Sequence, residues 1–117
     1  MKILIIINDA PYGTEKFYNA MRLAMTLLKE HSETEVLIFL MADAVTGALT
    51  NQNTPQGYYN IERMLKSITN KGGKVKLCGG CIDARGLSTL QYIEGCERSS
   101  MSELAQWSVE ADKVFTF

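Results

Sequence analysis

A chain of 117 residues with 46% hydrophobic and 21% charged residues has the composition of a single globular domain, which argues against disorder. Its formal net charge of -1 offers no basic surface for nucleic acid or for an anionic membrane. The apolar run at residues 3–7 is too short to span a bilayer or to act as a signal peptide, so we expect a cytoplasmic protein. Its three cysteines are odd in number, which argues against a disulfide framework and fits a reducing compartment.

The first half of the chain alternates between buried strands and helices. Residues 2–8 form a continuous β-branched run, which is typical of a strand buried on both faces of a parallel sheet. A proline- and glycine-containing loop precedes a helix predicted over 14–30, with apolar residues at helical spacing. A second buried strand is predicted over 35–41 and a short helix over 42–49. Residues 50–59 form a polar surface loop that ends in two tyrosines.

The central part of the chain contains the two most closely spaced cysteines. Asn60 is expected to cap a helix that stops at two consecutive glycines, and a strand follows over 74–77. The strand is predicted to break into a glycine-rich turn at 78–81, with Asp83 as the candidate N-cap of a following helix. This turn is the centre of the predicted site.

The last third of the chain completes the alternation. Residues 86–92 are ambiguous between a loop and a short helical turn, and residues 95–97 are a candidate short strand. Ser100 and Glu103 fit a capping box that opens a helix, and residues 114–117 form a final strand. This order predicts right-handed crossovers and a mostly parallel sheet that is covered on both faces.

Parallel strands deliver their carboxyl ends to one edge of the sheet, which is where open α/β sheets bind ligands. The loop after the first strand, the turn after the second and the cysteine turn after the third should therefore converge. The residues that this topology is expected to gather are Asn8, Asp9, Tyr12, Asp43, Cys78 and Arg85. For Asp43, a plain helix N-cap is the competing interpretation.

Cys78 ends a strand and precedes a predicted helix start, where unpaired backbone N–H groups favour a thiolate. A free cysteine has a pKa of about 8.5, and a depression of roughly 2 units would make the thiolate the main species at neutral pH. Arg85 would add a cation if the chain folds back. The alternative is a structural turn with two incidental buried cysteines, which are common.

Four chemistries compete for this turn. A single C-x-x-C pair has too few ligands for structural zinc, and the lone His31 ends a helix, so we predict no metal and no cofactor. A thioredoxin-like dithiol would normally have a stiffer loop than Gly79-Gly80, and a phosphate loop would need a lysine and longer glycine spacing. Single-thiol chemistry remains, in which Cys78 accepts and releases a sulfur atom or forms a mixed disulfide.

Several segments together resemble the DsrE/DsrF-like family, in particular its YchN-type branch, over essentially the whole chain. They are the opening strand with residues 8–13, the segments 39–45, 76–78 and 85–86, and the closing segment 103–114. The resemblance implies a three-layer α/β/α domain over residues 1–117, with a five-stranded, mainly parallel sheet and flavodoxin-like winding. It also implies homotrimers that pair as hexamers and a link to sulfur metabolism.

In better understood relatives of this kind, persulfide sulfur passes from protein to protein, and the acceptor cysteine corresponds to Cys78. The pair that follows it corresponds to Arg85-Gly86, whereas Cys81 is not shared by the relay proteins as a group and is a candidate resolving thiol. The resemblance does not identify the sulfur donor or the acceptor, and it does not separate a carrier from an enzyme.

The sequence therefore predicts a cytoplasmic, homo-oligomeric sulfur-handling protein that carries persulfide on Cys78 with help from Arg85. The remaining pocket residues are predicted to be Asn8, Asp9, Tyr12, Asp43, Gly79, Gly80, Cys81 and Gly86. Tyr58-Tyr59 is a candidate contact with a neighbouring subunit, and donor and acceptor proteins are the other expected partners. Two alternatives stay open: a binding module whose cleft Cys78 only lines, and a Cys78/Cys81 dithiol redox protein.

Overall fold

The computed structural model describes residues 1–117, which form five strands, four α-helices and one 3₁₀ helix. In chain order they are β1 (Lys2–Ile7), α1 (Lys16–Glu30), β2 (Glu35–Leu40), η1 (Ala42–Ala48), α2 (Ile61–Asn70), β3 (Lys74–Cys78), α3 (Gly79–Ala84), β4 (Cys96–Ser99), α4 (Met101–Glu110) and β5 (Lys113–Thr116). The ambiguous residues 86–92 contain no helix or strand, only turns and one isolated bridge from Tyr92 to Leu49.

The five strands form one sheet in the order β4-β3-β2-β1-β5, and every neighbouring pair is parallel. The predicted alternation of strands and helices around a parallel sheet is confirmed. The strand order differs in detail from flavodoxin-like winding, in which the first and third strands are neighbours. Here β2 separates β1 from β3, and the chain crosses back over the sheet to add β5 beside β1.

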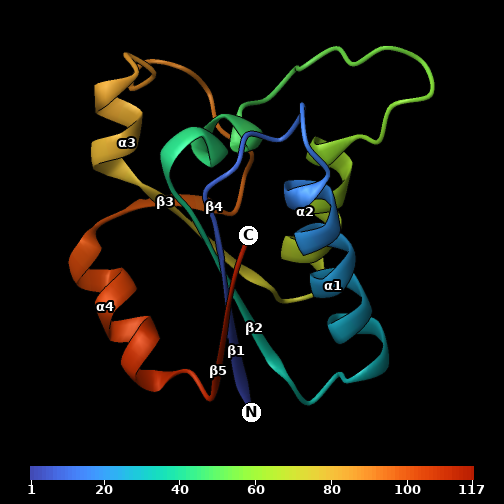
Figure 1. Ribbon diagram of the computed structural model, residues 1–117, viewed down its shortest axis with the longest axis vertical. Helices are drawn as coiled ribbons and strands as arrows, with labels where there is room; N and C mark the ends of the chain where they lie inside the picture. The colour runs from blue at the N-terminus through green and yellow to red at the C-terminus, as the bar shows by residue number, and fades with distance from the viewer.

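The two faces of the sheet are covered unequally. Figure 1 shows α1 and α2 on one side of the sheet and α4 on the other. The first side holds a core of 20 buried residues, to which α1, α2, η1 and α3 all contribute, with fully buried Phe17 at its centre. Burying such a side chain stabilises the fold by roughly 1.5–3 kcal/mol, so this layer contributes most of the stability.

The second face is covered by one helix. Leu104 and Trp107 of α4 pack on Leu4, Leu37 and Phe39, and the ring of Trp107 meets that of Phe39 edge-on at 6.4 Å. The three-layer α/β/α architecture is thus confirmed, with a thin second layer. None of the helices combines the length and the apolar character that a membrane crossing requires.

Helix caps match the sequence patterns in two places. The Asn60 side chain accepts a hydrogen bond from the Arg63 N–H at the start of α2, and the Ser100 side chain accepts one from the Glu103 N–H at the start of α4. Glu103 does not complete the capping box in the usual way, because its carboxylate binds Lys76 at 2.6 Å and the Ser99 hydroxyl at 2.7 Å. These contacts fasten α4 to β3 and β4.

Candidate functional site

Cys78 lies where β3 passes directly into α3, with no turn between them. It is the last residue of β3 and the N-cap of α3, and its Sγ accepts a hydrogen bond from the Cys81 N–H at 3.3 Å. The predicted glycine-rich turn is wrong, because Gly79 and Gly80 adopt helical geometry as the first residues of α3. The sulfur is half-buried between the two apolar layers.

The resting Cys78 side chain is a thiol rather than a thiolate. Burial raises the pKa of Cys78, and the neighbouring Cys81 side chain raises it further through hydrogen bonding and charge. The N–H groups of Cys81 and Gly80 act in the opposite direction without offsetting the rise. The prediction that the strand end favours a thiolate is therefore wrong for the isolated chain, because desolvation outweighs the backbone donors.

Cys81 is held by a donor from a distant part of the chain. Its Sγ accepts a hydrogen bond from the Ala42 N–H at 3.2 Å, at the junction of β2 and η1. Ala42 has a φ of 51°, a left-handed conformation that is strained for a residue other than glycine. The fold thus maintains an unfavourable backbone conformation at the point where this N–H meets the sulfur.

Arg85 and Asp43 form an ion pair next to the two cysteines. The Arg85 Nε and Nη2 donate to Asp43 Oδ1 at 3.0 and 2.9 Å, and Nη1 donates to the Cys81 carbonyl at 3.2 Å. The predicted convergence of these residues is confirmed, but no hydrogen bond joins Arg85 to the Cys78 sulfur. Arg85 instead links α3 to η1, and Met41 rather than Asp43 occupies the N-cap position of η1.

Arg98 is a site residue that the sequence analysis missed. Its Nη1 and Nη2 donate to the two carboxylate oxygens of Asp83 at 2.8 and 2.6 Å. The prediction of Asp83 as a helix N-cap is therefore wrong. Hydrogen bonds to Asp83 and the charge of that carboxylate raise the pKa of Arg98, and Cys78 would add a smaller effect when it is ionised.

Strand register places Arg98 next to the start of α3. β4 pairs with β3 so that Cys78 lies opposite Ser99, the residue after Arg98. A Cβ on Gly79 would lie 2.8 Å from the Arg98 Nε, so the guanidinium group occupies the space that a side chain there would fill. The candidate strand at 95–97 gave a signal for β4, but its pairing partner cannot be read from the sequence.

The remaining predicted glycine sites have structural roles. Gly86 has a φ of 67° and ends α3: its N–H donates to the Asp83 carbonyl at 3.0 Å, and the Leu87 N–H donates to Ile82 at 3.1 Å. This is the Schellman pattern, for which glycine is favoured. Gly80 is exposed, and a Cβ at that position would lie 4.0 Å from the Cys78 Sγ.

The three candidates after β1 do not contact the cysteines through any hydrogen bond or ion pair. The Asn8 N–H donates to the Phe117 carbonyl, and the Asp9 carboxylate accepts from the Thr14 hydroxyl at 2.9 Å. Tyr12 accepts from the Ile61 N–H at 3.2 Å. Because β2 lies between β1 and β3, the ends of these two strands are about 10 Å apart, so the predicted site divides into two clusters.

The second cluster consists of tyrosines, namely Tyr12, Tyr18, Tyr58 and Tyr59. Tyr59 stacks on Tyr18 at 4.2 Å and on Tyr12 at 5.6 Å between ring centroids, so it packs within its own chain. Tyr58 remains 59% exposed. The rings of Tyr18, Tyr58 and Tyr59 border an open hollow of about 690 Å³. Of the predicted contact pair Tyr58-Tyr59, only Tyr58 is thus largely accessible to a partner.

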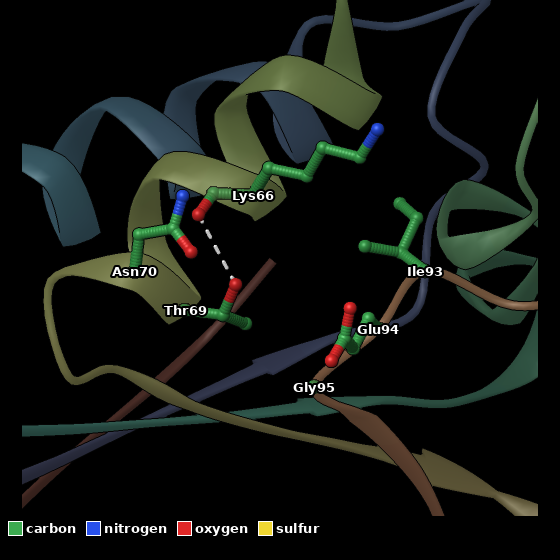
Figure 2. Close-up of a pocket in the computed structure, with 6 residues that line it drawn as sticks. All are labelled: Lys66, Thr69, Asn70, Ile93, Glu94 and Gly95. Carbon is green, nitrogen blue, oxygen red and sulfur yellow. Dashed lines mark hydrogen bonds between the residues drawn. The ribbon is translucent and has the colours of Figure 1, made fainter.

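No hollow in the structure is lined by Cys78 or Cys81. Figure 2 shows one hollow, of about 380 Å³, between α2 and residues 93–95, where Thr69 donates to the Lys66 carbonyl and no cysteine is present. No group of three or more His, Cys, Asp or Glu side chains could hold a metal ion. The two partly buried thiols at the carboxyl end of the sheet are therefore not part of any of these hollows.

A model of the DsrE/DsrF-like family matches residues 1–117, the whole of the chain. The chain belongs to this family. DsrE/DsrF-like proteins are associated with sulfur relay. Protein YchN of Escherichia coli (strain K12) is 48% identical over 116 residues, which cover 99% of this chain and 98% of YchN. An uncharacterised protein of Methanocaldococcus jannaschii is 42% identical over 117 residues, with full coverage of both chains.

Solved structures agree with this membership. The crystal structure of YchN from E. coli matches with a TM-score of 0.94 and covers 99% of this chain and 98% of its own. A protein of unknown function from Methanobacterium thermoautotrophicum matches with a TM-score of 0.78 at 11% identity, over 99% of this chain and 97% of its own. The second likeness is one of fold alone. This DsrE/DsrF-like chain thus shares its fold well beyond its recognisable sequence relatives.

Proposed function

We propose that this DsrE/DsrF-like protein is a cytoplasmic sulfur carrier that holds sulfane sulfur as a persulfide on Cys78. The observation that carries the proposal is the position of the Cys78 sulfur: at the carboxyl end of β3, partly exposed and bonded by the Cys81 N–H at 3.3 Å. Because the sulfur is partly exposed at the edge of the sheet, a docked partner protein would have access to it. The association of the family with sulfur relay gives independent support.

The transfer is a thiol exchange. The Cys78 thiolate attacks the outer sulfur of a donor persulfide, the donor's S–S bond breaks, and the donor leaves as a thiolate. No external oxidant or reductant is consumed, because the outer sulfur only changes its partner. The raised pKa of Cys78 keeps its thiolate fraction low at neutral pH, which slows reaction with dilute small electrophiles and favours a donor protein docked at the site.

The two alternatives differ in their support. A small-ligand module whose cleft is lined by Cys78 is disfavoured, because the four hollows are lined by other residues. A dithiol redox protein is favoured by one observation, the direct Cys81 N–H contact with the Cys78 sulfur. It predicts that a reversible Cys78–Cys81 disulfide forms without any sulfur donor.

The test uses a sulfur-35-labelled persulfide donor and the full chain. Wild-type protein and a Cys96→Ser variant should both take up label, and Cys78→Ser should take up none. Cys96 is the matched control because it is a free cysteine of the same chain that begins β4, away from the carboxyl end of β3 where Cys78 lies. Label that persists in Cys78→Ser would contradict the carrier function, and reversible oxidation without uptake of label would favour the dithiol alternative.

We also propose that the protein is a homo-oligomer in which a second copy covers β5. This strand lies at the edge of the sheet, and Val114 and Phe115 are 47% and 41% exposed. Unpaired strand edges with apolar side chains readily pair with another chain. Sedimentation at micromolar concentration should detect an oligomer, and Phe115→Lys should shift it toward monomer. A monomeric wild-type protein would refute this part of the proposal.

A further inference from the structure

Cys78 and Cys81 form a matched pair of accessible sulfurs. Cys78 is the N-cap of α3 and Cys81 is the third residue of the same helix, positions whose side chains face each other in capping boxes. The Cys81 N–H donates to the Cys78 Sγ at 3.3 Å, and both thiols are free and partly exposed. The two thiols therefore lie at the same helix start, in the C-x-x-C spacing that dithiol proteins use to form a disulfide.

The third cysteine does not belong to this pair. Cys96 lies on β4 opposite Val75, three residues before Cys78 along β3, which corresponds to about 10 Å. Burial raises the pKa of Cys96 to about 12, so it stays a neutral thiol under ordinary conditions. Within this chain, only Cys81 can reach a group attached to the Cys78 sulfur.

The Cys81 sulfur also has a fixed donor of its own. The Ala42 N–H lies 3.2 Å from it and comes from the β2–η1 junction, 39 residues away. Ala42 is strained at a φ of 51°, and the adjacent Asp43 is held by Arg85, which also binds the Cys81 carbonyl. These contacts fix the position of the sulfur and direct an N–H group at any negative charge that forms on it.

We propose that Cys81 discharges the persulfide on Cys78, so that sulfur leaves the protein as sulfide. This inference rests on the proposed function, since it requires sulfur on Cys78. The Cys81 thiol gives its proton to water, and the thiolate attacks the Cys78 Sγ. The bond between that Sγ and the outer sulfur breaks, and the outer sulfur departs with the electron pair as hydrosulfide.

The electrons balance without an external oxidant. The outer sulfur is reduced to sulfide, and the two cysteine sulfurs are oxidised to a Cys78–Cys81 disulfide. A second turnover requires a dithiol reductant of the thioredoxin class or an excess of a small thiol, which returns both cysteines to thiols. With Cys81, the protein thus releases sulfide once and must be reduced before it can accept sulfur again.

The experiment mixes full-length protein with less than one equivalent of glutathione persulfide. Transfer to Cys78 releases one glutathione and no sulfide. Because that glutathione can also reduce a persulfide, only sulfide in excess of the amount formed by Cys81→Ser reports attack by Cys81. Wild-type protein and Cys96→Ser should give a burst of sulfide and a Cys78–Cys81 disulfide in peptide mass spectra. Cys81→Ser should instead retain a persulfide on Cys78 that lasts at least about tenfold longer, because an intramolecular thiol acts at high effective concentration.

Each outcome separates the two proposals. Equal persulfide lifetimes in wild-type protein and Cys81→Ser would overturn the role of Cys81 and leave the carrier function intact. The absence of added sulfur on Cys78 in both proteins would overturn the carrier function and this inference with it. In Cys81→Ser the serine hydroxyl could still accept the hydrogen bond from the Ala42 N–H, and Cys81→Ala removes that acceptor. The inference requires the persulfide on Cys78 to last as long in Cys81→Ala as in Cys81→Ser, and thermal unfolding checks that both variants remain folded.

Discussion

The packing of η1 against α1 supports the end of the site that contains Ala42. A glycine-to-alanine substitution in η1, which adds one methyl group, tests this packing. Gly47 lies near the end of η1 and is buried against the ring of Phe17. A Cβ at position 47 would lie 2.6 Å from the Phe17 Cζ and 2.7 Å from Cε2. Phe17 is completely buried, so its ring has no empty space into which it can move freely. Gly47→Ala should therefore destabilise the protein.

The magnitude follows from the overlap. Carbon atoms pack best at about 3.5 Å or more, so the ring or η1 must shift by about 1 Å. Overpacking of this kind costs about 1–3 kcal/mol. Replacing glycine by alanine in a helix returns about 0.5–1 kcal/mol, because the unfolded chain loses freedom. We expect Gly47→Ala to lower the free energy of unfolding by up to about 2.5 kcal/mol, with a mid-range value of about 1 kcal/mol.

Urea denaturation at equal protein concentration measures this difference, since oligomers unfold in a concentration-dependent way. Gly80→Ala is the matched control: the heavy atom nearest to its Cβ would be the Cys78 Sγ at 4.0 Å, so this variant should gain about 0.5–1 kcal/mol. Adding Phe17→Leu to Gly47→Ala should cost less than the two single changes together. A midpoint for Gly47→Ala at or above the wild-type value would refute the packing argument.

Two further predictions concern the cysteines. Arg98→Gln should raise the pH midpoint of Cys78 alkylation and slow alkylation at neutral pH by about twofold to fivefold, because the exposed Arg98 charge favours the Cys78 thiolate weakly. An unchanged midpoint in residue-resolved mass spectrometry would show that Arg98 does not act on Cys78. For Cys96, burial holds the folded-state pKa at about 12, above the value of about 8.5 in an unfolded chain. Its contribution to stability is therefore complete at neutral pH and is lost as the pH rises from about 8.5 toward 12, by at most about 1.4 kcal/mol per pH unit. Cys96→Ala should show a flatter decline in urea unfolding over that range, and parallel curves for the two proteins would contradict the assignment.

Much of the fold could be predicted because its causes are local. The apolar runs of β1 and β2 are buried on both faces of a sheet, and Asn60 and Ser100 cap their helices as their positions indicate. The alternation of strands and helices then limits the topology to a parallel sheet. Local pattern failed at Gly79-Gly80, where two glycines suggested a turn but a capped helix begins at once.

The sequence predicted only some of the residues that lie beside the cysteines. Asp43 and Arg85 were correctly expected beside the cysteines, because strand ends on one edge converge. The rule that strand ends converge at one edge wrongly placed Tyr12 and Asp9 beside the cysteines, because it does not specify which strands are neighbours. Since β2 intervenes, the β1 loop belongs to the tyrosine cluster instead.

The sequence by itself determined most of the elements and the parallel sheet, and it made Cys78 the candidate residue, since these follow from hydrophobic period, capping residues and the spacing of two cysteines. Strand order and register, which depend on contacts between residues far apart in the chain, were decided only in the tertiary structure. They brought Arg98 beside Cys78 and the Ala42 N–H to Cys81. Burial then raised the pKa of Cys78 that the local sequence had suggested would fall, because the desolvation of a sulfur depends on what packs around it.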